Sequence, residues 1–204
     1  MLEKMRVYFI TDSKFGKHEV LAEKALKGGV RTIQLREKLK PAREVYQIAK
    51  KLRRLTHDYN ALLIINDRVD IAMAADADGV HVGQNDLPAE CFRHLFDGII
   101  GVSANTVEEA KKAENYADYL GVGPVFSTST KRDAKKPIGT EELKKIVEST
   151  KLPVIAIGGI NEENVLSVLE CGVAGIAVVS AIAGKDDIIS AASKLLETVT
   201  KFWR

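Results

Sequence analysis

The stretch Gly121-Val-Gly-Pro-Val-Phe-Ser-Thr-Ser-Thr-Lys-Arg-Asp-Ala-Lys-Lys-Pro-Ile-Gly139 begins as the end of an apolar strand and becomes a run of hydroxyls and cations. Residues 127–130 all carry hydroxyl groups, and Lys131 adds a positive charge. Such a loop is suited to holding a phosphate group and placing a cation over it. A solvated surface loop has the same composition. The interpretation therefore depends on where this stretch falls in the pattern of the whole chain.

The change from apolar strand to polar loop recurs from one end of the chain to the other. Short β-branched runs alternate with longer segments of helical periodicity. We expect strands at residues 6–11, 32–36, 61–65, 79–82, 99–102, 119–122, 154–157 and 175–179. Their ends are spaced by about 24 residues, which accommodates a strand, a helix and two short loops. The repeat predicts an α/β protein with a closed (β/α)8 TIM barrel, and an open parallel sheet is the alternative.

Local signals place the helices between these strands. Gly28 ends a helix expected at 17–27, Pro41 and Pro88 each open one, and Thr106 with Glu109 forms a capping pattern. Further helices are expected at 69–75, 140–149 and 187–202. No linker or charge block interrupts the pattern, so we expect one TIM-barrel domain over residues 1–204.

Composition narrows the classes of function. The chain has 204 residues, 46% of them hydrophobic, and a net charge of +2 with 28% charged residues of both signs. This balance argues against a general nucleic-acid binder. Cys91 and Cys171 are far apart and show no metal-ligand spacing, which predicts reduced thiols. The four histidines show no paired ligand spacing either. No apolar run of about 18 residues appears, so we expect no membrane partner and a cytoplasmic protein.

Two cations follow the second expected strand, in Gln34-Leu-Arg-Glu-Lys38. Because side chains alternate along a strand, Gln34, Arg36 and Lys38 share one face while Leu35 points outward to the helices. Arg36 and Lys38 then point into the barrel mouth, where a diphosphate would be a matching anion. An intramolecular ion pair, for instance with Asp67, is the alternative.

Two carboxylates follow the third and fourth strands. Asp67 comes after Asn66, and Asp86 closes Gly83-Gln-Asn-Asp86. Adjacent strand ends bring both carboxylates near the two cations, which suggests a Mg²⁺ ion that takes few protein ligands and completes its shell with phosphate oxygens and water. Each aspartate could equally cap a helix.

Glycine-rich turns follow the last two strands. Gly158 and Gly159 leave the backbone bare, Val179 and Ser180 follow the eighth strand, and many barrels bind phosphate at this corner. A tight turn alone would also explain the glycines. Together with the site at the ends of the second to fourth strands, this corner gives two expected anion-binding sites at one mouth of the barrel. Such an arrangement suits an enzyme that joins a diphosphate compound to a monophosphate compound.

The chain resembles the thiamine phosphate synthase family. The resemblance covers nearly its whole length and rests on Gln34-Leu-Arg-Glu-Lys38, Ile65-Asn-Asp67, Gly79-Val-His-Val-Gly-Gln-Asn-Asp86, Gly101-Val-Ser103, Gly123-Pro-Val-Phe-Ser-Thr-Ser-Thr-Lys131, Ile157-Gly-Gly-Ile160 and Val179-Ser-Ala-Ile182. It implies a transferase that joins 4-amino-2-methyl-5-(diphosphooxymethyl)pyrimidine to thiazole phosphate. The products would be thiamine phosphate and pyrophosphate, and a carboxylated thiazole phosphate is the alternative acceptor. The implied mechanism is Mg²⁺-assisted and dissociative, with a pyrimidine-methyl cation that the thiazole nitrogen captures.

Site residues follow from the resemblance position by position. It implies that Arg36, Lys38 and Lys131 stabilise the leaving pyrophosphate and that Asp67 and Asp86 bind Mg²⁺. The implied substrate-binding residues are Gln34, Leu35, Arg36, Glu37, Lys38, Asn66, Ser103, Thr128, Ser129, Thr130, Lys131, Gly159, Val179 and Ser180. The expected partners are therefore small-molecule substrates.

Two other functions stay open at this point. A thiazole tautomerase resembles the synthase in fold but, in that branch, a His follows the glycine of the sixth strand, where this chain has Pro124. A catalytically silent barrel that binds a phosphorylated ligand is the other. Only the synthase should require Mg²⁺ for turnover. The sequence leaves the oligomeric state open, a homo-oligomer included.

Overall fold

A computed structural model describes residues 1–128, 130 and 136–203. Parallel strands pair in chain order and the last pairs with the first, so the sheet closes into an eight-stranded barrel. The strands are β1 (Val7–Asp12), β2 (Thr32–Arg36), β3 (Leu62–Asn66), β4 (Gly79–Val82), β5 (Ile99–Ala104), β6 (Tyr119–Val122), β7 (Val154–Ile157) and β8 (Gly175–Val178). The expectation of a closed (β/α)8 barrel is confirmed.

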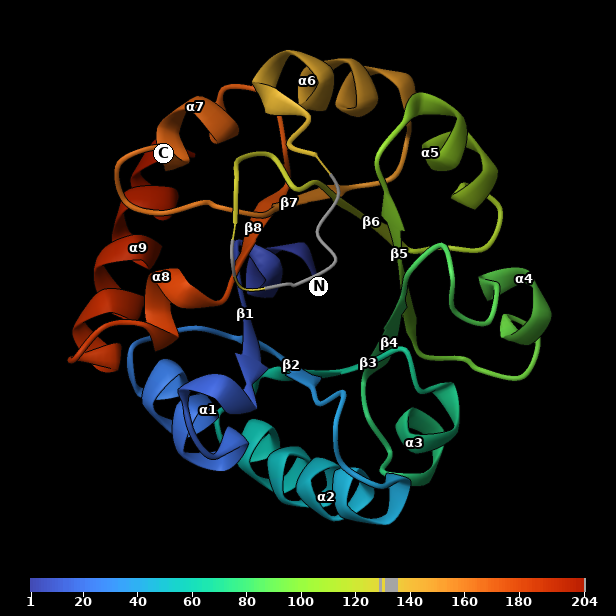
Figure 1. Ribbon diagram of the computed structural model, residues 1–204, viewed down its shortest axis with the longest axis vertical. Helices are drawn as coiled ribbons and strands as arrows, with labels where there is room; N and C mark the ends of the chain where they lie inside the picture. Colours follow the sequence, from blue (N-terminus) through green and yellow to red (C-terminus); the bar gives the residue numbers. More distant parts are fainter. Residues whose placement is uncertain (129, 131–135, 204) are drawn as a thin grey trace.

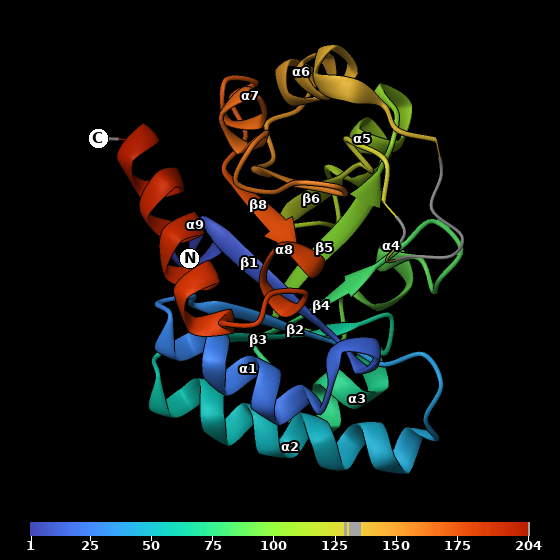
Figure 2. The ribbon, with the colours of Figure 1, turned by 60° about the vertical axis from the view of Figure 1, so that its left-hand side comes forward.

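Helices surround the strands, as the view along the barrel in Figure 1 shows. They are α1 (His18–Lys27), α2 (Ala42–Asp58), α3 (Val69–Ala74), α4 (Ala89–Phe92), α5 (Val107–Ala113), α6 (Gly139–Ser149), α7 (Val165–Leu169), α8 (Ser180–Ala183) and α9 (Ile188–Phe202). Figure 2 shows α1 and α2 side by side along the lower side of the barrel and α9 along its left side; α1 contacts both. Two short 3-10 helices, η1 (Leu2–Met5) and η2 (Ser13–Phe15), flank β1.

The strands bury side chains on both faces. Outward residues such as Leu35 pack with the helices into a large outer core. A smaller cluster fills the barrel and consists of Met5, Tyr8, Ile10, Ile64, Tyr119, Ile155 and Ala177. Met5 ends η1, which lies in the middle of the strand ring in Figure 1. This segment therefore closes the amino-terminal end of the barrel and leaves the other end for ligands.

Most element boundaries match the sequence-based expectations. Thr106 caps α5 through its hydroxyl, which accepts from the Glu109 N–H at 3.2 Å. Asp187 caps α9 in the same way, accepting from the Ser190 N–H at 3.0 Å. No residue range was predicted for the short elements η1, η2, α7 and α8, because three to five residues carry too little periodicity to be recognised. Within the described residues no helix is both long and apolar enough to cross a membrane.

Candidate functional site

A cavity of about 140 Å³ opens at the carboxyl ends of the strands. Its lining includes Tyr8, Ile10, Gly83, His81, Tyr119, Gly121, Ile155, Ile157 and Ala177. It also includes polar residues singled out from the sequence, namely Gln34, Arg36, Lys38, Asn66, Asp67, Asp86 and Ser103. The fold therefore brings the predicted diphosphate, metal and pyrimidine residues of β2 to β5 to one cavity.

Arg36 is held by a residue that the sequence did not single out. Its Nη1 donates to Asp12 Oδ2 at 2.6 Å, and Asp12 Oδ1 also accepts from the Lys14 N–H at 3.0 Å. Asp12 lies at the end of β1, directly opposite Arg36 in the strand register. One of the five N–H donors of the guanidinium is used in this contact, so the plane of the group is oriented while other donors face the cavity.

Lys38 donates to Asp67 Oδ2, so the ion pair considered as an alternative does form. Asp67 has φ of 62°, a left-handed conformation that is uncommon outside glycine. This backbone directs its side chain across the strand ends toward Lys38 instead of along α3. The capping alternative for Asp67 is not supported, because the N-cap of α3 is Arg68 and makes no side-chain cap contact.

The two carboxylates predicted to bind Mg²⁺ are near one another. Burial raises the pKa of Asp67, and a side-chain contact with Asp86 raises it further, while Lys38 acts in the opposite direction. Asp86 Oδ2 accepts from the Gly83 N–H at 2.7 Å, which closes the β4–α4 turn, and the N-cap of α4 is Pro88. A crowded, partly buried carboxylate pair is a setting in which a divalent cation is stabilising.

No group of three or more His, Cys, Asp or Glu side chains that could hold a metal ion occurs among the described residues. A site with only two protein carboxylates suits Mg²⁺, which commonly keeps several waters and binds substrate phosphates as well. The residues present therefore fit the expected ion as one that is held jointly by the protein and a phosphorylated substrate.

Two residues of the Gln34–Lys38 segment face away from the cavity. Leu35 is 1% exposed and packs in the outer core. Glu37 accepts from the Leu39 N–H at 2.8 Å and contacts His18 Nε2 at 3.3 Å. Burial acts to raise the pKa of Glu37, but the hydrogen bonds from Leu39 and His18 outweigh it and lower that pKa. Both residues support the segment from behind, and any contact with substrate would be made by their backbone.

A line of polar side chains crosses the barrel interior below the mouth. Gln34 Nε2 donates to the Tyr8 hydroxyl at 2.7 Å, and the hydroxyls of Tyr8 and Tyr119 are 3.1 Å apart. The Tyr119 hydroxyl lies 3.0 Å from His81 Nδ1, and His81 Nε2 lies 2.9 Å from Ser103 Oγ. These residues connect Gln34 on β2 with Ser103 on β5.

The predicted phosphate corner is formed where the loops after β6 and β7 pack together. The Phe126 N–H donates to the Gly158 carbonyl at 3.0 Å. Gly159 has φ of 67°, and a Cβ there would lie 2.6 Å from the Ser127 carbonyl oxygen. Backbone crowding therefore requires glycine at this position in addition to any need of a ligand.

The remaining described residues predicted for this corner are Thr128, Thr130, Val179 and Ser180. The Thr130 N–H donates to Thr128 Oγ1 at 3.3 Å, and Lys14 Nζ donates to the Thr130 carbonyl at 3.1 Å. Val179 precedes α8, and Ser180, the first residue of that helix, is exposed. Ser129 and Lys131, two further predicted residues, lie outside the described residues.

The sequence analysis did not assign a role in the site to four residues: Tyr8, Asp12, His81 and Tyr119. Alternation along the strand could have identified His81. Val80 and Val82 on either side of it point outward, so His81 must point inward, by the same rule that separates Leu35 from Gln34 and Arg36. Tyr8 and Tyr119 stand in apolar runs without alternation, and Asp12 was placed beyond the strand.

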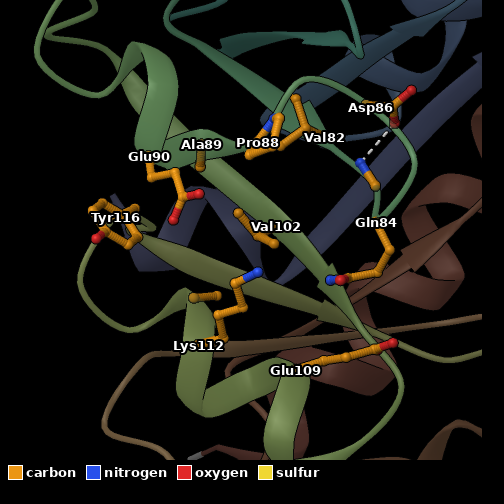
Figure 3. Close-up of a pocket in the computed structure, with 12 residues that line it drawn as sticks. Val82, Gln84, Asp86, Pro88, Ala89, Glu90, Val102, Glu109, Lys112 and Tyr116 are labelled. Carbon is orange, nitrogen blue, oxygen red and sulfur yellow. Dashed lines mark hydrogen bonds between the residues drawn. The ribbon is translucent and has the colours of Figure 1, made fainter.

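A second cavity, of about 90 Å³, lies outside the barrel between α4 and α5. Figure 3 shows Val102 near its centre, with Glu90 and Tyr116 to the left and Lys112 below. Gly83 and Asp86 line both cavities, so the β4–α4 turn is the wall between them.

Known proteins match this chain over most of its length. Residues 7–182 match the family model described as thiamine monophosphate synthase. The chain is 60% identical over 199 residues to thiamine-phosphate synthase of Archaeoglobus fulgidus, covering 97% of this chain and 95% of that protein. It is 48% identical over 202 residues to the enzyme of the same name from Methanococcus maripaludis, covering 98% and 97%. A solved structure, thiamine phosphate pyrophosphorylase from Pyrococcus furiosus, is similar with a TM-score of 0.91 and 47% identity, covering 97% of this chain and 98% of that one.

Proposed function

This chain belongs to the thiamine monophosphate synthase family, and we propose that it performs thiamine phosphate synthesis in the cavity at the carboxyl ends of β2 to β5 by a Mg²⁺-assisted dissociative reaction. The enzyme is a transferase that acts on small-molecule substrates. The observation that carries the proposed mechanism is the meeting of Arg36, Lys38, Asp67 and Asp86 at one cavity. Cations and a carboxylate pair in one place suit a diphosphate that carries a divalent cation.

Arg36 and Lys38 have different tasks in this proposal. Arg36 is oriented by Asp12 at 2.6 Å and presents further N–H donors to the diphosphate. Lys38 is half-exposed and forms an ion pair with Asp67. Asp67 would hold the divalent cation that accompanies the diphosphate. Lys38 would then be available to bind the phosphate oxygens of the leaving group.

Asp67 and Asp86 would hold Mg²⁺ together with the diphosphate. The ion would supply positive charge to the oxygens that become negative as pyrophosphate leaves. The raised pKa of Asp67, caused by burial and by Asp86, supports this assignment because a bound cation would stabilise the charged carboxylates.

The bond changes balance without a protein nucleophile. The C–O bond of the pyrimidine methylene breaks, its electron pair leaves with pyrophosphate, and the thiazole nitrogen then gives a pair to the methylene carbon to form the C–N bond. Arg36, Lys38 and Lys131 would stabilise the growing charge on the leaving oxygens. The apolar lining of the cavity, including Ile155 and Ile157, would keep water from the methylene cation.

We place the thiazole phosphate at the corner of Gly159, Val179 and Ser180, next to the described hydroxyl residues Thr128 and Thr130. The backbone contacts between the loops after β6 and β7 support this placement, since they bring Gly159 next to the segment that leads to Thr128. A carboxylated thiazole phosphate is the alternative substrate. A cytoplasmic location is likewise proposed, supported by the free cysteines Cys91 and Cys171, and homo-oligomeric assembly stays a prediction.

The tautomerase alternative is not favoured, because the relatives at 48% and 60% identity are named synthases. The test is an assay of the purified protein with both phosphorylated substrates, following thiamine phosphate and pyrophosphate together. We expect equal amounts of both products, and loss of turnover with EDTA that excess Mg²⁺ restores. Turnover that persists in EDTA would overturn the Mg²⁺-assisted mechanism, and isomerisation of the thiazole alone would overturn the synthase assignment.

A further inference from the structure

The line of side chains from Gln34 to Ser103 has a direction, and the direction starts at Gln34. The amide nitrogen of Gln34 can only donate, so the Tyr8 hydroxyl accepts from it at 2.7 Å. The other described partner of the Tyr8 hydroxyl is the Tyr119 hydroxyl, 3.1 Å away. Tyr8 therefore directs its own proton to the Tyr119 oxygen, because a buried phenol retains one donor to place.

The same reasoning continues through Tyr119 and His81. The Tyr119 hydroxyl accepts from Tyr8 and donates to His81 Nδ1 at 3.0 Å. A neutral imidazole that accepts at Nδ1 carries its proton on Nε2. His81 Nε2–H then donates to Ser103 Oγ at 2.9 Å. Ser103 thus accepts from the protein, and its hydroxyl proton is left for a ligand in the cavity.

The space for this arrangement is provided by glycines on the neighbouring strands. A Cβ at Gly101 would lie 2.4 Å from both His81 Nδ1 and the Tyr119 hydroxyl, directly at their hydrogen bond. A Cβ at Gly121 would lie 2.7 Å from His81 Cε1. The rings of His81 and Tyr119 are tilted with centroids 5.5 Å apart, so the contact is made at the edges. The glycine backbones therefore fix the plane of the imidazole ring, and its two hydrogen bonds fix the direction in which each ring nitrogen points.

We propose that Tyr119 is a positioning residue for pyrimidine recognition, which holds His81 in the Nε2–H tautomer and so makes Ser103 a hydrogen-bond donor to a ring nitrogen of the substrate. This rests on the proposed function only in naming the pyrimidine as the ligand of Ser103. The opposite direction, with His81 carrying its proton on Nδ1, would turn Ser103 into an acceptor for an amino group. Burial raises the pKa of Tyr8 and of Tyr119, which keeps both hydroxyl protons in place at neutral pH.

The tautomer can be measured in the free protein without any substrate. The full chain, labelled with ¹⁵N in its histidines, is studied by two-bond ¹H–¹⁵N correlation at neutral pH, and the His81 signals are assigned by their loss in His81→Gln. We expect a pyridine-type shift for Nδ1 and a pyrrole-type shift for Nε2. The reverse pattern would overturn the proposal, whatever the enzyme's activity.

A matched pair of variants separates the role of Tyr119 from general loss of a buried hydroxyl. Tyr119→Phe removes the donor to Nδ1, and we expect His81 to populate both tautomers. Tyr8→Phe also removes one buried hydroxyl but leaves Tyr119 as a donor to His81, so the Nε2–H tautomer should persist. Loss of the tautomer in Tyr8→Phe, or its retention in Tyr119→Phe, would overturn the assignment. The wild-type and Tyr8→Phe measurements decide the matter if Tyr119→Phe does not fold.

Kinetics then tests whether Tyr119 acts through His81. We expect Tyr119→Phe to raise the KM for the pyrimidine diphosphate about tenfold, the scale of one hydrogen bond, with little change in the KM for thiazole phosphate. In a His81→Gln background, where an amide supplies a donor to Ser103 regardless of Tyr119, the same substitution should have no further effect. An equal effect in both backgrounds would overturn the positioning role. Absence of synthase activity in the wild type would instead count against the proposed function.

Discussion

Asp12 and Arg36 end neighbouring strands and meet at the rim of the cavity, where Arg36 Nη1 donates to Asp12 Oδ2 at 2.6 Å. The side chain of Asp12 is 7% exposed and that of Arg36 is 19% exposed. A charge-assisted hydrogen bond with so little exposure orients the guanidinium before any ligand arrives. The strength of diphosphate binding should therefore depend on a residue that need not touch the diphosphate.

Asp12→Asn should raise the KM for the pyrimidine diphosphate by about tenfold, because a neutral amide holds Arg36 less firmly. Steady-state kinetics with each substrate varied in turn measures this. Asp78→Asn is the control, since Asp78 pairs with Arg53 at 3.1 Å at the opposite, amino-terminal end of a strand. The control should lower stability without a selective effect on KM. An equal change of KM for both substrates in Asp12→Asn would contradict the orienting role.

Asp67→Ala should lower kcat/KM by on the order of a hundredfold or more and raise the Mg²⁺ concentration needed for half-maximal activity. The reason is that only Asp67 and Asp86 are proposed to anchor the ion on the protein. Activity measured as a function of Mg²⁺, with circular dichroism to verify the fold, gives the answer. Asp70→Asn, in the exposed pair with Arg68, is the control. Normal turnover of Asp67→Ala at limiting Mg²⁺ would show that the carboxylate is structural.

Gly159→Ala should impair thiazole phosphate binding more than pyrimidine diphosphate binding. The new Cβ would meet the Ser127 carbonyl and displace the loop that contributes to this corner. Gly172→Ala is a matched control, because Gly172 also has a positive φ, of 83°, but its Cβ would meet only Val147 at 3.6 Å. Both variants should lose about 1 kcal/mol of stability from backbone strain. If Gly159→Ala changes both KM values alike, the phosphate lies elsewhere.

Lys131→Ala should lower kcat more than it raises the KM for the pyrimidine diphosphate, on the order of a hundredfold for one lost contact to the leaving group. Lys131→Arg should restore only part, since a planar guanidinium does not replace a compact ammonium. Lys136→Ala, an exposed lysine of the same segment, should change neither parameter. A rise in KM alone for Lys131→Ala would mean that the residue only binds the substrate.

Glu37→Gln should weaken the pH dependence of stability on the acid side. The pKa of Glu37 is lowered in the folded protein, so its contribution is fully present above the ordinary glutamate value of about 4.3 and is lost as pH falls through the folded value. Denaturant unfolding from pH 7 to pH 3 should show a difference from wild type that shrinks toward low pH. Glu44→Gln, in the exposed pair with Lys40, is the control. A difference independent of pH would show that packing, not charge, accounts for Glu37.

Some of the site followed from local sequence because strand geometry is local. Alternation along 32–38 was sufficient to send Leu35 outward and Gln34, Arg36 and Lys38 to the cavity, and the structure places them so. The eightfold repeat of strand and helix also predicted the barrel over the open parallel sheet, and the structure closes the sheet. The helix caps at Thr106 and Asp187 are local in the same sense, because each side chain accepts a hydrogen bond from a backbone N–H three residues further along the chain.

Partner choice was decided only by the tertiary structure. Arg36 binds Asp12 and Lys38 binds Asp67 because the register of β1, β2 and β3 brings those strand ends together, and register is a relation between strands. Glu37 was expected at the substrate and is found against His18, across a gap of 19 residues in sequence. The line from Gln34 on β2 to Ser103 on β5 passes through side chains of three other strands, β1, β6 and β4, and no single segment of sequence encodes that combination. Long-range closure of the barrel, which makes residues distant in sequence into hydrogen-bond partners, is the physical reason.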